Sequence, residues 1–427
     1  MSPSKNSRTG NGGTSKYRAP RPLIDSLDEL VSPLAYSRRV LKQASSEADS
    51  AEFPEDAFDD LVHTITFLQA YDGSSATFNS YRREVERLLQ WCWLIQGKAL
   101  GELSRQDLEA YIHFCQDPPP SWIGTKQAAR FVNRNGERVI NDQWRPFVSK
   151  PDKLGNTPSM ALSQKSLQSL FAVLSTYFNF LIQEDYLRLN PVSLIRQKSK
   201  FLQRHAYQEP VRRLSNLQWD FILETVERLA KENPAEHERT LFIMKCLFGM
   251  YLRISELVAD ERSAPVMGDF QQDQDGHWWL RVVGKGNKAR MVTVSDDMLV
   301  ALRRYRTHLG LPPLPYVAEH TPLLPKLRGR GPVTSTRQVR YLVQRCFDLA
   351  YERMAKTGLE EEAQELRVST VHWLRHTGIS EDVKFRPKEH VREDAGHASM
   401  ATTDRYIDTE MRERHASARH KKLKPEL

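Results

Sequence analysis

Apolar residues recur at helical spacing in the first half of the chain. The segment "TFNSYRREVERLLQWCWLIQ" has an apolar face and an arginine-bearing opposite face, which predicts a helix over about 77–95 with Thr77 as its N-cap. The segment "SRQDLEAYIHFCQ" predicts a second helix capped by Ser104, and the prolines of "DPPPSW" end it. A third helix is expected over residues 163–186, ending before "NP".

Residues 117–160 lack this helical period. The run "RFVNRNGERVI" places two short β-prone segments around Asn135-Gly136, a strong signal for a tight hairpin. The hairpin carries Arg130, Arg134 and Arg138. It is either a structural surface hairpin or a basic ribbon that reaches DNA or a neighbouring protomer.

The second half alternates between the two periods. Residues 215–232 predict a helix with a Ser or Asn cap, and the strongly apolar stretch 237–258 predicts a long helical segment in a core. The run "HWWLRVV-GKGNK-ARMVTVS" switches to a period of two and predicts a hairpin turning at Gly284 to Lys288. Four more helices are expected at about 295–308, 336–356, 372–383 and 401–415. The fold class expected is mainly α with a small antiparallel β-sheet.

At 427 residues the chain is long enough for two or three domains. We expect a disordered or extended basic leader over 1–50 and a helical domain over 51–195 that contains the 117–160 insertion. A basic linker over 196–213 separates it from a second domain over 214–410, and a basic tail follows over 411–427.

Composition narrows the class of protein. No run of eighteen apolar residues exists, and the N-terminus has no apolar segment typical of a secretory signal, so a membrane or secreted protein is not expected. The four cysteines are far apart without a CxxC pair, which favours reduced, buried thiols in the cytoplasm.

The formal net charge of +8 is compatible with a polyanionic partner. Basic residues crowd the linker, the loop "KLRGRG" with Arg328 and Arg330, and the C-terminal tail. These stretches are either solvated surface or contacts to the phosphates of a duplex.

Several charged residues stand where core packing should not tolerate them. Arg253 interrupts the apolar run "FGMYLRISEL", and a buried arginine needs a partner, for which Glu256 at i+3 is available. His372, Arg375 and His376 share one helical face in "TVHWLRHTGIS". Zinc is not expected there, because HxxRH lacks the glutamate of HExxH and places a cation among the histidines.

This inventory of arginines, histidines and a lysine favours phosphoryl transfer without a metal. Two guanidiniums can clamp a phosphodiester, and the ammonium of Lys285, in its glycine-flanked turn, can protonate a leaving alkoxide. The hydroxyl of Tyr406 has an ordinary pKa of about 10, but it can attack if an imidazole takes its proton.

Four segments occur in order: "GMYLRISEL", "VVGKGNKARMV", "HWLRHTGIS" and "AGHASMATTDRYI". Together they resemble the signatures of the tyrosine recombinases, the integrase family that includes phage integrases and the Xer proteins. The resemblance covers about residues 215–410, and the helices around 60–116 and 163–191 look like that family's core-binding domain. It implies a two-domain protein with a helical SAM-like core-binding domain and a mixed α/β catalytic domain.

The resemblance also implies roles for individual residues. Arg253 and Arg375 match the phosphate-clamping arginines, and Lys285 matches the general acid for the departing 5′ oxygen. His372 matches the histidine that manages the tyrosine proton, His397 the group that hydrogen-bonds the scissile phosphate, and Tyr406 the nucleophile that forms a 3′-phosphotyrosyl link.

His376 has a counterpart in the family's "RH" pair, and we expect it to be structural. No cofactor, metal or ATP is implied. Ala395 departs from the leucine usual before "GH".

We therefore expect a site-specific DNA recombinase or integrase, a DNA strand transferase of a mobile element. The alternatives are a type IB topoisomerase-like enzyme and a catalytically inactive site-specific DNA-binding protein. The expected partner is double-stranded DNA in the cytoplasm, at the nucleoid, bound by a homo-tetramer whose protomers are monomers or dimers when free. An accessory directionality factor is a further possible partner, and the tail 411–427 is a candidate for docking on a neighbouring protomer.

DNA contacts are expected from both domains. The candidates are polar side chains on two predicted helices, together with the basic loop: Arg82, Arg83, Arg87, Gln164, Lys165, Gln168, Arg328 and Arg330.

Overall fold

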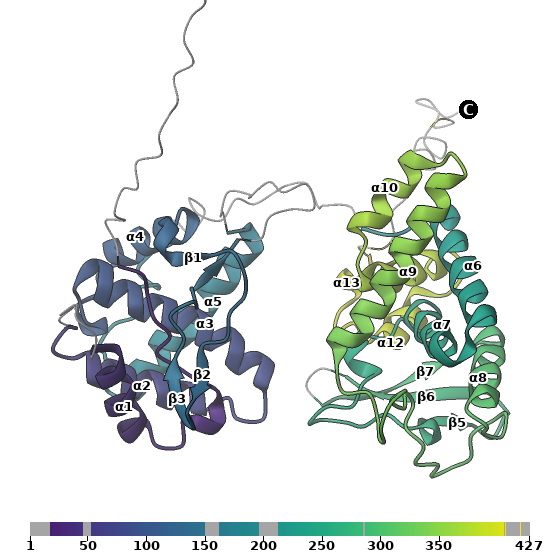
Figure 1. Ribbon diagram of the computed structural model, residues 1–427, viewed down its shortest axis with the longest axis horizontal. Helices are drawn as coiled ribbons and strands as arrows, with labels where there is room; N and C mark the ends of the chain where they lie inside the picture. Colours follow the sequence, from purple (N-terminus) through teal and green to yellow (C-terminus); the bar gives the residue numbers. More distant parts are fainter. Residues whose placement is uncertain are drawn as a thin grey trace, which may run out of the picture. The chain divides into compact units, whose positions relative to one another are not determined.

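The computed structural model describes residues 18–45, 53–149, 162–195, 212–284, 287–404, 406 and 419. The chain forms two compact units that divide between Ala206 and Tyr207, inside the stretch predicted as a linker. Both units are mainly helical (Figure 1). The mainly α fold with small sheets agrees with the prediction from the sequence.

The first unit packs its helices around one apolar core that includes Leu61, Leu88, Trp91 and Tyr177. Its α-helices are α1 Pro33–Ser45, α2 Ala57–Gln69, α3 Ser75–Trp91, α4 Arg105–Gln116 and α5 Gln164–Gln183.

One of the two caps predicted in this unit is present. Ser104 caps α4 by accepting a hydrogen bond from the backbone N–H of Asp107, and Ser163 caps α5 in the same way through Ser166. The predicted cap Thr77 is wrong, because α3 begins two residues earlier with Ser74 at its N-cap position. The Thr77 hydroxyl instead lies 2.8 Å from that of Ser74.

Residues 18–45 correct the expectation of a disordered or extended leader over 1–50. Leu23 and Ile24 are buried, and their backbone N–H groups donate to the Glu86 carboxylate on α3 at 2.6 and 2.9 Å. The amphipathic helix α1 then packs on α2. Polar composition misled the prediction here, because a few apolar residues and one buried carboxylate hold this segment in the core. Residues 1–17 lie outside the described part.

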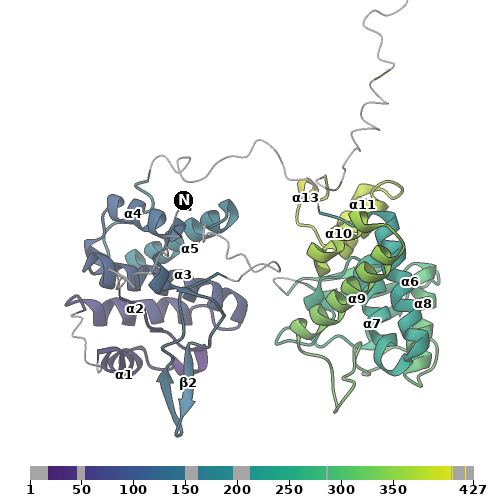
Figure 2. The same cartoon turned by 45° about the horizontal axis from the view of Figure 1, so that its top comes forward.

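The region between α4 and α5 contains two small sheets, as its non-helical pattern suggested. Two-residue strands β1 Ile123–Gly124 and β4 Phe147–Val148 pair in parallel, and β2 Phe131–Arg134 pairs with β3 Glu137–Ile140 in an antiparallel hairpin. Asn135 and Gly136 both have positive φ, 51° and 84°, which confirms the predicted tight turn. Figure 2 shows this hairpin projecting from the helices.

The second unit packs its helices against a three-stranded antiparallel sheet, which lies at one end of the unit (Figure 1). The strands are β5 Phe270–Gln272, β6 Trp278–Val283 and β7 Ala289–Thr293, in that order. The α-helices are α6 Asn216–Glu232, α7 Pro234–Gly249, α8 Asp296–His308, α9 Thr336–Lys356, α10 Glu360–Val368, α11 Val371–Asp382, α12 Lys388–Ala395 and α13 Met400–Asp404.

The long apolar stretch 237–258 is not one helix. Helix α7 ends at Gly249, Tyr251 has a positive φ of 50°, and a single 3-10 turn follows at Ile254–Glu256. The helix expected at 401–415 is described only as the short α13, and α10 and α12 were not predicted. Hydrophobic periodicity did not distinguish α7 from the loop that follows it, because the core buries that loop as completely as the helix itself.

Gly378 fixes how closely α11 approaches α7. A Cβ at this position would collide with the backbone carbonyl of Phe248. The two helices therefore pack with almost no side chain between them at this point. The same helix α11 carries His372, Arg375 and His376.

No helix within the described ranges is long and apolar enough to cross a membrane. The predicted linker 196–213 and tail 411–427 lie outside the described residues, apart from 212, 213 and 419.

Candidate active site

A cavity of about 1270 Å³ opens in the second unit between the hairpin β6–β7 and α12. Basic side chains dominate its charged lining, which includes Arg253, Lys288, Arg290 and His397. Four of the six predicted catalytic residues line this cavity or lie next to its lining: Arg253, Arg375, His397 and Tyr406. The charges of Arg375 and Arg253 also act on His372.

Arg375 is the most constrained cation of the site. Its side chain is nearly buried, at 5% exposure, and its two terminal nitrogens donate to the backbone carbonyls of Tyr251 and Ala395. Burial, followed by the charge of Arg253, lowers its pKa to about 10. At neutral pH the guanidinium is therefore charged, and it is held by two carbonyl oxygens rather than by a directly paired carboxylate among the described residues, which leaves it available to an anion.

Arg253 and Arg290 share one carboxylate. Glu256 is buried and accepts from Arg253 at 3.0 Å and from Arg290 at 2.8 and 3.0 Å. Burial would raise the pKa of Glu256, but hydrogen bonds and charge from Arg290, with Arg253, lower it overall. The expected Arg253–Glu256 pair is therefore present, and Arg290 makes the group a triad with an excess positive charge.

Gly396 lets α12 end against this triad. Its φ of 62° ends α12 in the left-handed region, and its carbonyl accepts from Arg253 at 3.2 Å. A Cβ here would come within 3.0 Å of the Arg290 side chain. Arg290 also donates to the carbonyl of Asp394 at 2.9 Å, so strand β7 and α12 are joined at the site.

Tyr406 lies in a small apolar cluster with Tyr251, Ile379, Val391 and Ala395, and its side chain is 7% exposed. Its Oη is 2.7 Å from Nδ1 of His376. From the family resemblance we expected His372 to manage the proton of the Tyr406 hydroxyl and His376 to be structural. In the structure the Tyr406 hydroxyl is hydrogen-bonded to His376, one turn further along α11 than His372.

His397 packs its ring on Tyr406, with centroids 5.6 Å apart and planes inclined by 14°. Its Nδ1 lies 3.0 Å from the hydroxyl of Thr403. Burial, with the charges of Arg375 and Arg253, lowers the pKa of His397 to about 4. Burial also lowers the pKa of His372, with Arg340 and Arg375 contributing. His397 is therefore neutral at physiological pH.

Lys285 lies outside the described residues, and so its predicted position is not available for comparison. Lys288 at the other end of the same turn is exposed and lines the cavity. The sequence analysis did not single out Arg290, although it lies within the recognised segment "VVGKGNKARMV", and it expected His376 to be structural.

No metal site is formed by the histidines of α11 within the described part of the chain. The grouping there with metal-ligand spacing is Asp273, Asp275 and His277, three exposed residues in the β5–β6 turn. Asp273 already accepts hydrogen bonds from Trp279 and from the backbone of His277.

The predicted DNA-contacting residues differ in exposure. Arg87 is buried at 4% exposure and paired with Glu84 at 3.0 Å, so it is not on a solvated helix face. Arg82 is half-buried, whereas five of the others are exposed: Arg83, Lys165, Gln168, Arg328 and Arg330. Gln164 is half-buried in the first turn of α5.

No family model matches the chain, but individual relatives do. Tyrosine recombinase XerC of Chlorobaculum parvum is 24% identical over 264 residues, covering 59% of this chain and 71% of that protein. Tyrosine recombinase XerC of Bradyrhizobium diazoefficiens is 29% identical over 332 residues, covering 74% and 88%.

Solved structures share the fold. The XerH site-specific recombinase bound to palindromic difH substrate, in a post-cleavage complex, aligns with a TM-score of 0.56 at 15% identity over 94% of this chain and 99% of that chain. The Tn1549 transposon integrase in complex with a circular intermediate DNA aligns with a TM-score of 0.51 at 15% identity, over 84% and 97%.

Proposed function

We propose that Tyr406 is the nucleophile with which this chain cleaves its DNA. The chain belongs to the tyrosine recombinase family and is a DNA strand transferase for site-specific recombination. The observation that carries the proposal is the 2.7 Å contact between Tyr406 Oη and His376 Nδ1, beside the buried Arg375. A phenol hydrogen-bonded to an imidazole can lose its proton as it attacks.

The arginines would hold the scissile phosphate. Arg375 is oriented by the carbonyls of Tyr251 and Ala395, and Arg253 by Glu256 and the carbonyl of Gly396. Both are fixed before DNA arrives, so they stabilise the charge of the pentacoordinate transition state without reorganising.

In the cleavage step the Tyr406 oxygen bonds to phosphorus and the bond from phosphorus to the 5′ oxygen breaks. The phenol proton passes to His376, and the 5′ oxygen gains a proton, for which we propose Lys285. Neutral His397 would hydrogen-bond a non-bridging oxygen. A second strand's 5′-hydroxyl then attacks the 3′-phosphotyrosyl link and restores the tyrosine, so the steps need neither ATP nor a metal.

A nicked suicide substrate tests the nucleophile. It carries the native element end, recovered from flanking genomic DNA, and the full chain is assayed in EDTA for a covalent protein–DNA band. We expect a band with the wild type that persists under chelation and disappears in Tyr406→Phe. Specific DNA binding without any band would mean that the chain is a DNA-binding factor instead.

The two histidines of α11 are separated by a matched pair of variants. In His376→Asn a neutral amide retains a hydrogen bond to Tyr406 but is not basic, and we expect single-turnover cleavage to fall by roughly 10²–10⁴-fold, as for loss of a general base. Added imidazole should restore part of the rate. If only His372→Asn shows this loss and rescue, the base is His372 and His376 is structural.

Membership of this family also supports a proposal for the biological setting of the reaction. We propose that the chain integrates or excises a mobile element at the nucleoid, as a tetramer on paired sites, with an accessory directionality factor as a candidate partner. Removing residues 411–427 should then weaken assembly of the paired complex more than binding to one site. Native gels with one and two duplexes distinguish these outcomes, and equal loss of both would contradict the assignment.

A further inference from the structure

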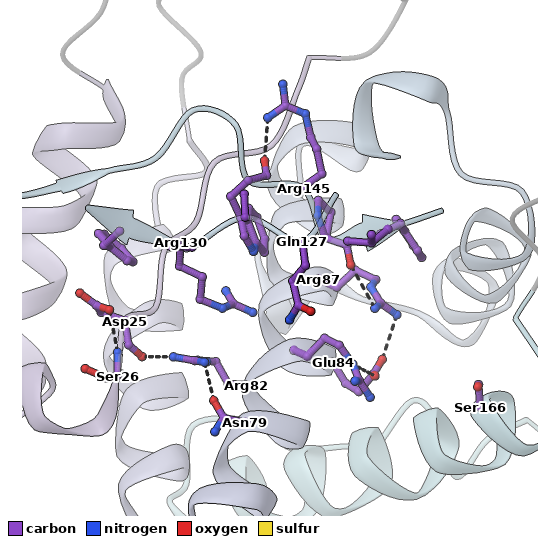
Figure 3. Close-up of a pocket in the computed structure, with 18 of the residues that line it drawn as sticks. Asp25, Ser26, Asn79, Arg82, Glu84, Arg87, Gln127, Arg130, Arg145 and Ser166 are labelled. Carbon is purple, nitrogen blue, oxygen red and sulfur yellow. Dashed lines mark hydrogen bonds and ion pairs between the residues drawn. The ribbon is translucent and has the colours of Figure 1, made fainter. Parts of the chain in front are cut away.

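The first unit contains a second basic cavity, of about 1030 Å³, between α3, the first turns of α5 and the inserted segment 120–149 (Figure 3). Among the described residues, seven cationic side chains line it, against two carboxylates, Asp25 and Glu84. The seven are Arg82, Arg83, Arg87, Arg130, Arg138, Arg145 and Lys165.

The two carboxylates are already occupied. Asp25 accepts two hydrogen bonds from Arg138, at 2.7 and 2.9 Å, and Glu84 accepts from Arg83 and Arg87 at 2.7 and 3.0 Å. A fourth arginine, Arg130, pairs with Glu86 on the core side of α3.

These pairs attach the insertion to the rest of the unit. Arg130 and Arg138 come from the insertion and bind carboxylates on α3 and on the N-terminal segment. In the other direction, Arg87 from α3 stacks on Phe147, with its guanidinium 4.3 Å from the ring centroid. Residues 120–149, the part of the insertion that lines the cavity, are therefore attached to the helices as one of its walls.

The remaining cations have no carboxylate partner among the described residues. Arg82 donates to the carbonyl of Asp25 and to Asn79, and Arg145 donates to the carbonyls of Asp142 and Trp144. Lys165 is exposed in the first turn of α5, where the helix dipole disfavours a cation. Helix stability therefore does not explain the position of Lys165.

We propose that the inserted segment 120–149 is a DNA-contacting wall, which with α3 and α5 forms a groove for the phosphodiester backbone of the duplex. The inference rests on the proposed function and deepens it. It gives a role to a segment that lies outside the four recognised motifs. Arg145 contacts phosphate from the insertion, and Lys165 contacts it from α5, with Ser166 and Ser169 as neutral donors on the same side.

An extended polyanion fits this surface better than a small anion. Arg82, Arg145 and Lys165 come from three different elements, and Figure 3 shows Arg145 directed away from the arginines of α3, at the edge of the cavity. Cations that do not converge on one point match charges repeated along a strand, whereas a single phosphate ion needs converging donors.

The test is the salt dependence of binding, measured with the full chain and a short fluorescent duplex. The logarithm of the DNA-binding constant falls with the logarithm of the salt concentration, and each lost phosphate contact makes this slope shallower by about 0.9. The double variant Arg145→Ala with Lys165→Ala should therefore make the slope shallower by about 2. Arg38→Ala is the matched control, because Arg38 is exposed on α1 of the same unit and does not line the cavity. It should leave the slope unchanged.

Each outcome is decisive. An unchanged slope in the double variant, with its thermal unfolding intact, overturns the proposal, and so does an equal loss in Arg38→Ala, because binding would then be spread over the whole unit. If the wild type forms the covalent band of Tyr406 while the double variant keeps its slope, the recombinase function stands and only the DNA-contacting wall fails. The reverse result, a lowered slope without a covalent band, retains the groove and removes the catalytic assignment.

Discussion

The two basic cavities, one in each unit, hold their arginines by different means. In the groove of the first unit, Arg87, Arg130 and Arg138 are each paired with a carboxylate. In the active site, Arg375 is held by two backbone carbonyls, and Arg253 shares the single carboxylate of Glu256 with Arg290.

The difference separates two uses of the same residue. A guanidinium paired with its own carboxylate is neutralised and acts as an anchor, whereas one held by carbonyl dipoles is oriented but keeps its charge. The count of arginines in a cavity is therefore a poor guide to its affinity for phosphate. Their partners decide it.

The largest effect should come from replacing the carbonyl-held arginine. Arg375→Lys keeps the charge but cannot bind both carbonyls and present a planar face to phosphate. We expect single-turnover cleavage to fall by roughly 10²–10³-fold, with DNA affinity changed little. Quantifying the covalent band over time and the binding isotherm on the same duplex measures both, and full activity in Arg375→Lys would mean that charge alone suffices.

An anchoring arginine should act on stability instead. Arg138→Gln leaves the buried carboxylate of Asp25 without its two charged hydrogen bonds and loosens the attachment of the insertion. We expect a loss of about 2–3 kcal/mol in the free energy of unfolding of the first unit. Denaturant unfolding followed by tryptophan fluorescence reports it, while Arg38→Ala should be neutral.

Removing one carboxylate from each cavity tests the contrast directly. Glu84→Gln and Glu256→Gln should each cost about 1–2 kcal/mol of stability, because each leaves a partly buried guanidinium uncompensated. Glu84→Gln should also tighten DNA binding, since it adds net positive charge to the groove. Glu256→Gln should slow cleavage, because Arg253 and Arg290 lose their common support.

Acid should also distinguish Glu256→Gln from the wild type. The pKa of Glu256 is lower in the folded state, so its contribution to stability is present above its unfolded value of about 4.5 and is lost as the pH falls through the folded value. Glu256→Gln should therefore lose part of the acid sensitivity of the wild type. Urea unfolding of both proteins at mildly acidic and neutral pH measures this difference, and identical pH profiles would contradict it.

A further pH dependence of the stability should come from His397. Its folded pKa of about 4 lies below the ordinary value of 6.5, because of burial and of Arg375, Arg253, His376 and Arg290 around it. The unfolded chain binds the proton first, so stability falls as the pH drops from about 6.5 towards 4. His397→Asn should flatten that part of the stability profile, as urea midpoints at several pH values would show.

Much of the fold followed from local pattern. The cap Ser104, the Asn135-Gly136 turn and the β6–β7 hairpin depend on residues a few positions apart, and each is present as predicted. The end of α7 was not predictable in this way, because Tyr251 and Leu252 continue the apolar run past Gly249 and are buried like the helix. The backbone there leaves the helical path at Tyr251, whose carbonyl accepts from Arg375 on α11.

The sequence by itself determined which residue types are available: the four motifs, their order, and the arginines, histidines and tyrosine they carry. Tertiary structure alone decided how they are paired. It joined Tyr406 to His376, made Arg290 a partner of Glu256, and buried Arg87 under an insertion some sixty residues away along the chain. Pairing depends on distances between elements remote in sequence, and no local periodicity encodes them.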